Sequence, residues 1–230
     1  MSRTLLITGT GTDIGKTFVT AELVRQLRDR GFEALAAKPV SSGCQGDAQG
    51  RLWSPDGVVL TEACGFDPAD WASHQRLCLE RFKEPMSPHM AAARAGRILS
   101  LPMLTGYCQS LEGETDGFVL AEGVGGVMTP LTDSATFQDW AVDLGWPVLL
   151  VAGTYLGTIS HTLTALRCLR GAGVRLAGLV LNRSPEEPVP PEELRRTLAF
   201  FEPELPMAVV PRAGEAMPDL VGAFGIDADA

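Results

Sequence analysis

The alternation of short apolar runs with amphipathic segments constrains the fold of this chain more than any other feature. The run Pro147–Ala152 is apolar at every position, so a strand formed there must be buried on both faces. Such strands are typical of a mostly parallel sheet with helices on each side, and we therefore predict an α/β fold. Strands are expected at Leu5–Thr8, Ala34–Val40, Gly117–Ala121, Pro147–Ala152, Leu176–Leu181 and Met207–Val210.

Helical patterns separate most of these runs. In Lys16–Arg30 apolar residues recur every three or four positions, and Gly31 follows as a stop signal. Ser87 followed by Pro88 predicts a helix start with Ser87 as its cap. The chain shows no internal repeat or long linker, so we expect one domain over residues 1–230; the stretch Ser41–Glu84 yields no clear prediction. Helices are expected at Lys16–Arg30, Ser87–Ala95, Phe137–Leu144, Thr158–Arg170 and Pro191–Phe201.

Charge and cysteine content exclude several classes of protein. With 19 basic and 28 acidic residues the net charge is −9, so neither nucleic acid nor an anionic membrane surface is expected as a partner. No apolar run approaches the roughly 20 residues of a membrane helix, and the first apolar segment is too short for a signal peptide. The five cysteines are widely spaced and include no Cys-x-x-Cys pair. This argues against disulfides or a zinc site and favours a cytoplasmic location.

A glycine-rich loop joins the first predicted strand to the first predicted helix, with the sequence Gly9-Thr-Gly-Thr-Asp-Ile-Gly-Lys-Thr17. In such a position backbone N–H groups and the helix N-terminus bind phosphates. Lys16 can contact the β- and γ-phosphates, and the Thr17 hydroxyl can join the shell of a Mg²⁺ ion. The usual pattern has glycine where this chain has Thr10, with Gly9 one residue earlier. An incidental glycine-rich turn is the alternative interpretation.

Two carboxylates are candidates for the same metal ion. Glu122 follows the predicted strand Gly117–Ala121, at the sheet edge where ligands bind in such folds. A glutamate at a strand end can equally be a solvated surface residue. Asp56, in Ser-Pro-Asp-Gly, is by itself more typical of a helix cap or a turn.

Lys38 lies at the end of the second predicted strand, before Pro39. A lysine at such a position is usually solvated. A second cation beside Lys16 would instead suit a substrate that adds negative charge next to the phosphates.

Together these motifs resemble those of the dethiobiotin synthetase family. The resemblance spans roughly Gly9 to Asn182, and the lysine and Ser-Pro-His motifs are more specific than the phosphate loop, whose extra residue the family shares. The matching motifs are the phosphate loop, Lys38-Pro-Val with Ser42-Gly, Glu84-Pro-x-Ser-Pro-His89, Glu122-Gly-x-Gly-Gly126, Pro130-Leu-x-Asp133 with Asp139-Trp140, and Leu156-Gly-x-Ile-x-His161.

The resemblance implies a P-loop NTPase fold and an ATP- and Mg²⁺-dependent ring closure that forms dethiobiotin in biotin synthesis. The substrates would be 7,8-diaminononanoate, CO₂ or bicarbonate, and ATP. The products would be dethiobiotin, ADP and phosphate. A homodimer is also implied, because the residues that match the family's carboxylate-binding helix end, Leu156–Ser160, would serve the neighbouring subunit's site.

The same resemblance assigns roles to individual residues. Catalytic roles are implied for Lys38, Lys16 and Thr12, and Mg²⁺ binding for Thr17, Asp56 and Glu122. Substrate contacts are implied for Ser42, Gly157, Thr158, Ile159 and Ser160. Nucleotide contacts are implied for Asp13, Ile14, Gly15, Lys16, Thr17, Phe18, Asp56, Glu122, Gly123, Val124, Gly125, Asn182, Arg183, Pro211, Arg212 and Ala213. No chemical role is implied for His89 or His161, which we expect to be structural.

Two other functions deserve comparison. A nucleotide-switch ATPase of the partitioning type usually carries an extra lysine early in the phosphate loop, where this chain has Thr10 and Gly11. An amide-forming ligase of the corrinoid type would bring a glutamine-cleaving domain with a nucleophilic cysteine, and no cysteine follows Asn182. Dethiobiotin synthesis is therefore the preferred prediction.

Overall fold

The computed structural model describes residues 3–211 and 215–227. Its centre is a six-stranded sheet in the order β10-β9-β8-β1-β7-β2, and every pair of neighbours is parallel, as predicted. The strands are β1 (Thr4–Gly9), β2 (Ala34–Ala37), β7 (Phe118–Glu122), β8 (Val148–Gly153), β9 (Leu176–Asn182) and β10 (Met207–Val210).

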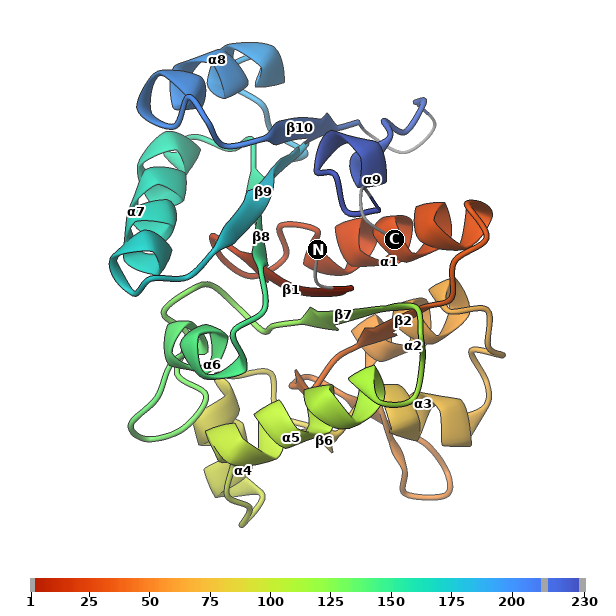
Figure 1. The fold of residues 1–230 in the computed structure, drawn as a ribbon. Coiled ribbons are helices and arrows are strands. Elements are labelled where there is room, and N and C mark those ends of the chain that lie inside the picture. Colours follow the sequence, from red (N-terminus) through yellow and green to blue (C-terminus); the bar gives the residue numbers. More distant parts are fainter. Residues whose placement is uncertain (1–2, 212–214, 228–230) are drawn as a thin grey trace.

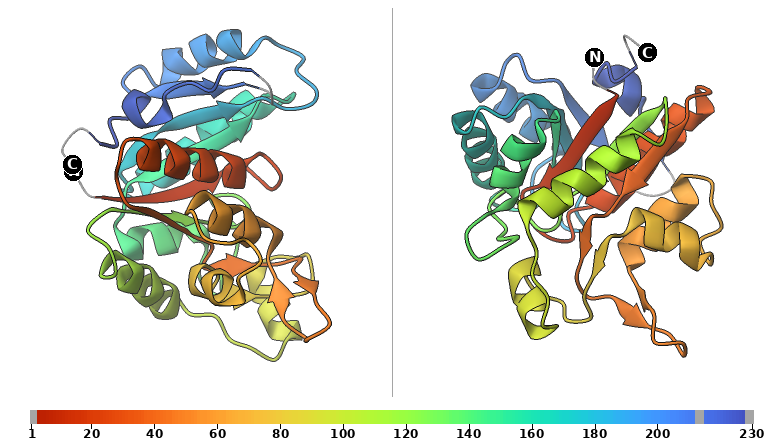
Figure 2. Two further views of the ribbon diagram at one scale, coloured as in Figure 1. Left: turned by 90° about the vertical axis from the view of Figure 1, so that its right-hand side faces the viewer. Right: turned by 60° about the horizontal axis from the view of Figure 1, so that its bottom comes forward.

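Helices cover both faces of this sheet (Figures 1 and 2). One layer contains α5 (Leu101–Glu112), α6 (Phe137–Leu144), α7 (Thr158–Gly171) and α8 (Pro191–Phe201). The other contains α1 (Lys16–Asp29), α2 (Pro55–Ala63), α3 (Trp71–Leu77) and α9 (Leu220–Ala223). None of the helices in the described part of the chain combines the length and apolar character needed to span a bilayer.

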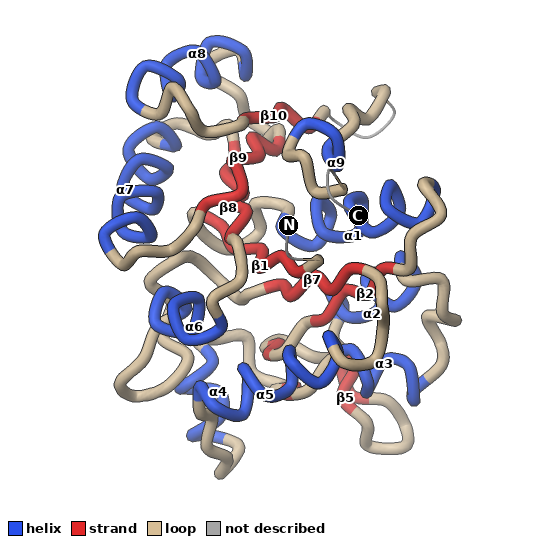
Figure 3. The backbone as a smooth tube through the Cα atoms, in the orientation of Figure 1, coloured by secondary structure: helices blue, strands red, loops and turns tan. Residues whose placement is uncertain are grey.

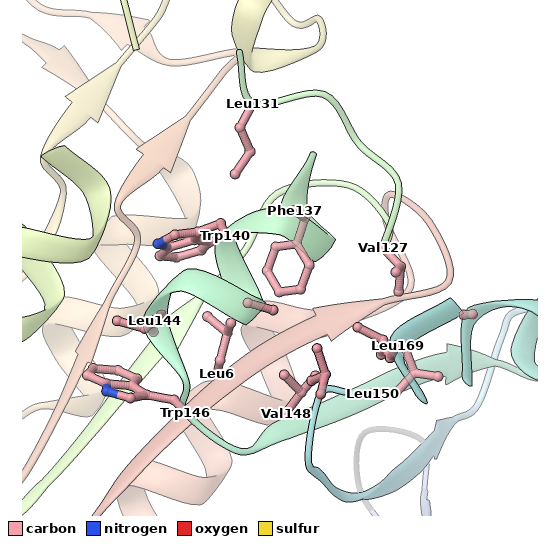
Figure 4. Close-up of a cluster of buried hydrophobic side chains, with 14 of the residues drawn as sticks. Leu6, Val127, Leu131, Phe137, Trp140, Leu144, Trp146, Val148, Leu150 and Leu169 are labelled. Carbon is pink, nitrogen blue, oxygen red and sulfur yellow. The ribbon is translucent and has the colours of Figure 1, made fainter. Parts of the chain in front are cut away.

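Two hydrophobic cores result, one on each face, because the apolar strands project side chains in both directions. In the core shown in Figure 4, Phe137 and Trp140 of α6 pack edge to face with ring centroids 5.6 Å apart. Leu6 of β1 and Leu150 of β8 belong to the same cluster. The central strands are thus fixed on both sides, and so is the edge at which they end.

The predicted strand Ala34–Val40 is wrong at its end. β2 stops at Ala37, and Val40 belongs to β3 (Val40–Ser41), which pairs with β6 (Glu80–Arg81) outside the main sheet. The chain leaves the sheet because the backbone N–H of Lys38 donates to Leu77, and Pro39 has no N–H to donate. This departure directs Lys38 away from the strand ladder.

The stretch that yielded no prediction contains α2, α3 and a short hairpin of β4 (Gln45–Gly46) and β5 (Leu52–Trp53). These segments lie beneath the sheet edge in Figure 3. Farther on, α4 (Pro88–Arg94) forms close to its predicted position, with Ser87 as its N-cap residue and Pro88 at the start of the helix, as predicted. The Ser87 side chain makes no capping hydrogen bond; its hydroxyl bonds instead to the carbonyl oxygen of Pro130 and to Nδ1 of His89.

Candidate active site

The carboxyl ends of β1, β7 and β2 meet at one edge of the sheet. Because β7 lies between β1 and β2, Glu122 at the end of β7 stands between the phosphate loop after β1 and Lys38 after β2. Glu122 is paired in register with Ile7, two residues before the loop begins at Gly9. Strand order, which brings these three segments together, thus places the candidate site where parallel sheets bind their ligands.

The loop after β1 is shaped for close approach by an anion. Gly15 has φ 90° and starts α1, and a Cβ there would lie 2.0 Å from Nδ2 of Asn182. Only glycine meets both conditions without strain. The Asn182 amide donates to the carbonyl oxygen of Ile14 at 2.9 Å, and Lys16 Nζ donates to that of Gly11 at 2.7 Å. The loop conformation is therefore fixed from beneath by β9.

A buried cluster of opposite charges lies beside this loop. Lys38 Nζ is 2.5 Å from Glu122 Oε1 and 2.7 Å from Asp56 Oδ2. The Thr17 hydroxyl donates to the same Glu122 oxygen at 2.8 Å. The Lys38 side chain is only 3% exposed and that of Glu122 is completely buried. Neither is a solvated strand terminus, which removes the surface interpretation of both residues.

Burial and charge act oppositely on the two lysines. Burial disfavours the charge on Lys38, but the adjacent carboxylates of Glu122 and Asp56 outweigh it and raise the pKa of Lys38 above its usual value. Burial, with the positive charge of Lys38, lowers the pKa of Lys16 to about 8. Lys38 is therefore held as a fixed cation, whereas Lys16 forms no ion pair with a carboxylate of the described residues and is suited to bind an anionic ligand.

The cluster also has the donors that a Mg²⁺ ion requires. The second carboxylate oxygen of Glu122, Oε2, is buried and has no hydrogen-bond partner among the described residues. Together with Asp56 and the Thr17 hydroxyl it supplies hard oxygen ligands, which Mg²⁺ prefers. The described residues contain no group of three or more His, Cys, Asp or Glu side chains able to hold a metal by themselves. The residues therefore fit a Mg²⁺ ion that takes its remaining ligands from phosphate and water.

Two adjoining cavities open at this edge. The first, about 510 Å³, contains the charged cluster and the phosphate loop; the second, about 960 Å³, runs past the loop toward α7. They share a wall of five residues, Thr12, Asp13, Ser42, Val124 and Gly125. Of the residues implicated by sequence, the first cavity is lined by Thr12, Asp13, Gly15, Lys16, Thr17, Lys38, Ser42, Asp56, Glu122, Val124 and Gly125.

Of the other implicated nucleotide residues that the structure describes, none is among those that line this cavity. Gly123 accepts a hydrogen bond from Lys38 through its carbonyl oxygen, and Phe18 is exposed on α1. Arg183 pairs with Glu187 and Glu215, so its guanidinium is engaged within the protein. Pro211 follows β10 and is half-buried. Arg212 and Ala213 lie outside the described residues.

No residue of the implicated carboxylate-binding segment Gly157–Ser160 lines either cavity, although His161, the next residue, lines the second. Gly157, with φ 95°, starts α7, and Thr158 is buried with its hydroxyl bonded to the carbonyl oxygen of Gly153. Ile159 is half-buried and Ser160 is exposed. Within this chain, then, Gly157–Ser160 is not brought to the charged cluster.

Sequence reasoning missed part of the site. The second cavity is lined by Met86, Val127 and Met128, and His161, expected to be structural, also faces it. The Glu84–His89 motif could have indicated this wall, because it belongs to the family resemblance but has no chemical role assigned to it. Ser41, which lines the first cavity, had no signal because its position depends on contacts with α2.

Comparison with known proteins shows that most of the chain is similar in sequence to proteins of one family. The family described as "AAA domain" matches residues 3–218. An "ATP-dependent dethiobiotin synthetase BioD" of Acidiphilium cryptum (strain JF-5) is 43% identical over 192 residues, covering 84% of this chain and 85% of that protein. The protein of the same name in Caulobacter vibrioides (strain NA1000 / CB15N) is 41% identical over 92% of this chain and 94% of its own length.

Solved structures resemble the chain in fold. The septum site-determining protein MinD of Pyrococcus horikoshii OT3, complexed with Mg-ADP, has a TM-score of 0.54 at 20% identity, over 92% of this chain and 82% of that one. A ParA family ATPase from Chlorobium tepidum TLS has a TM-score of 0.52 at 12% identity, over 92% and 84%. At such identities the likeness confirms the predicted P-loop architecture and says nothing of activity. The sequence relatives, at 41–43% identity over most of both chains, show the family as well: the chain belongs to the family of ATP-dependent dethiobiotin synthetases.

Proposed function

We propose that this protein forms dethiobiotin from 7,8-diaminononanoate and CO₂, with conversion of ATP to ADP and phosphate. The observation that carries the proposal is the shared wall of the two cavities, Thr12, Asp13, Ser42, Val124 and Gly125. A phosphate-binding cavity with buried cations directly adjoins a longer cavity with apolar residues. This arrangement suits phosphoryl transfer to an organic substrate with an alkyl chain.

In this proposal the first cavity binds the ATP phosphates. The loop N–H groups and Lys16 contact the phosphates, and Asn182 together with Pro211 borders the base. Thr17, Asp56 and Glu122 hold Mg²⁺, which supplies neutralisation of charge on the β- and γ-phosphates.

The second cavity takes the diamine, with Ser42 at its entrance. One amine adds CO₂ and loses a proton to become a carbamate, whose oxygen attacks the γ-phosphorus and releases ADP. The second amine then attacks the carbamate carbon, expels phosphate and closes the ring. The first attack brings one anion against another, and Lys38 and Lys16 reduce that repulsion in a cavity from which most water is excluded. Ring closure is intramolecular, which can supply at most roughly 7–11 kcal/mol.

The substrate carboxylate is proposed to bind at the start of α7 in a second copy of the chain. Leu156, just before Gly157, is 83% exposed, so an apolar side chain is available there for contact with a second copy. The free N–H groups of a helix start attract a carboxylate. A homodimer with two equivalent shared sites would use both features.

The direct test is an ADP-release assay with ¹³C-bicarbonate and mass detection of the product. We expect ADP release to require both the diamine and bicarbonate, and the label to appear in dethiobiotin at one carbon per ADP. ATP hydrolysis that ignores the diamine and bicarbonate would contradict the proposal and instead match a nucleotide-switch ATPase.

A further inference from the structure

A buried histidine on α3 lies behind the charged cluster and has no role in the proposed chemistry. His74 is completely buried, and its Nε2 accepts a hydrogen bond from the backbone N–H of Ser54 at 3.1 Å. A ring nitrogen that accepts must be unprotonated, so the proton of the neutral ring is on Nδ1. Burial and the positive charge of Arg81 lower the pKa of His74 to about 4, which keeps the acceptor available at neutral pH.

Ser54 connects this histidine to two other segments. Its hydroxyl oxygen accepts from the N–H of Gly57 at 3.0 Å and thereby caps α2. The same oxygen is 2.7 Å from the hydroxyl oxygen of Ser41, the residue before Ser42. One buried network therefore joins the start of α2, the end of β3, and α3.

Packing reinforces these hydrogen bonds. A Cβ on Gly57 would lie 2.8 Å from Cε1 of His74 and 2.2 Å from Sγ of Cys78, so the first turn of α2 rests directly on both side chains. The ring centroids of Trp53 and Trp71 lie 4.7 and 5.8 Å, respectively, from that of the His74 imidazole. This turn has little freedom to shift while His74 is in place.

Asp56 lies in that same turn, two residues after Ser54. We propose that His74 is a positioning residue, which acts through Ser54 to hold the carboxylate of Asp56 where Mg²⁺ binds. His74 itself touches neither metal nor substrate. The inference rests on the proposed role of Asp56 as a Mg²⁺ ligand. Mutation of a group that orients a metal ligand from outside typically lowers metal affinity by roughly 10–100-fold.

The chain allows a matched pair of variants. The amide group of glutamine reaches as far from the backbone as Nε2 of histidine, so His74→Gln can still accept from Ser54. Asparagine reaches only to the position of Nδ1, so His74→Asn cannot. Leu198→Ala, a core truncation in α8 on the other face of the sheet, controls for general destabilisation.

The measurement is binding of ADP to the purified full chain while Mg²⁺ is titrated. For His74→Asn we expect the Mg²⁺ concentration at half-maximal ADP binding to rise about tenfold, and for His74→Gln to stay near the wild-type value. An unchanged midpoint in His74→Asn, or the same rise in Leu198→Ala at an equal loss of Tm, would overturn the inference. Because the readout needs no diamine, a wild-type failure to release ADP in response to diamine would count against the proposed function alone.

Discussion

At the scale of single residues, the cluster around Glu122 decides what the site can do. Its buried carboxylate contacts both Lys38 and Thr17 through one oxygen, and its other oxygen has no hydrogen-bond partner among the described residues. One side chain thus fixes the position of Lys38 and, in the proposed function, would offer an oxygen to the metal. An uncompensated buried charge is costly, so the three groups stabilise one another before any nucleotide arrives.

Replacing Lys38 should affect the reaction more than nucleotide binding. Lys38 is outside the phosphate loop, whose N–H groups and Lys16 are the groups that we propose bind the ATP phosphates. We expect Lys38→Ala to lower kcat by about 10²–10³, equivalent to roughly 3–4 kcal/mol, with a small change in ATP affinity. Lys16→Ala should reduce both. Lys38→Arg should recover only part of the lost kcat, because the planar guanidinium group of arginine replaces the compact ammonium charge of lysine. Near-normal kcat in Lys38→Ala, or equal loss of ATP binding in both alanine variants, would contradict this role.

His74 should make stability depend on pH in a defined window. Its pKa is about 4 in the folded protein and near 6.5 when unfolded. Between these values the unfolded chain binds more protons, so the free energy of unfolding should fall as pH drops from about 6.5 to 4. The difference between wild type and His74→Gln should change over this window by on the order of 2–3 kcal/mol. Urea unfolding at several pH values measures it; parallel curves for the two proteins would refute the expectation.

At the scale of elements, the short helix α2 supplies one of the two carboxylates of the charged cluster. It begins at Pro55, is capped by Ser54, and presents Asp56 to the cluster from its first turn. Its acidic residue near the helix N-terminus is locally favourable. Its position against α3, however, depends on the absence of a side chain at Gly57.

Two glycine substitutions separate packing from helix propensity. Gly57→Ala would place a methyl group against Cys78 and His74, and we expect it to destabilise the fold by roughly 1–3 kcal/mol. Gly106 lies inside α5 with nothing within 4 Å of a built Cβ, so Gly106→Ala should stabilise by about 0.4–1 kcal/mol. Thermal unfolding of both variants measures these opposite changes in stability. A neutral Gly57→Ala would show that α2 can shift freely.

At the scale of the whole molecule, the homodimer that we propose would cover the exposed start of α7, where Leu156 and Gly157 lie at the surface. Light scattering should give a dimer at assay concentrations. Leu156→Asp should place an unpaired charge in that interface, shift the mass toward a monomer and raise the KM for the diamine without altering ADP binding. Phe200→Asp, at an 84% exposed site on α8, is the matched control and should change neither the mass in solution nor the KM for the diamine. A fully active wild-type monomer would exclude shared sites.

The sequence determined the architecture and the kind of site. Strands apolar on both faces must be buried on both sides, as they are in a parallel sheet covered by helices, and a loop such as Gly9–Thr17 between strand and helix has a strong local signature. The ends of β1 and β7 were predicted to within one residue, whereas the predicted end of the second strand, Val40, lies three residues beyond Ala37, where β2 stops. Glu122 and Lys38 could therefore be named as candidates before any geometry was known.

Only the tertiary structure decided how these candidates meet. The placement of β7 between β1 and β2 arises from long-range pairing, and it turns Glu122 and Lys38 from isolated strand-end residues into a buried ion pair. The short helices α2 and α3 pack against each other, and α2 also contacts α1 and β2, so their positions depend on contacts that their own weakly periodic sequences do not reveal. Asp56 and His74 therefore acquired their positions from neighbours distant in sequence, which no local pattern encodes.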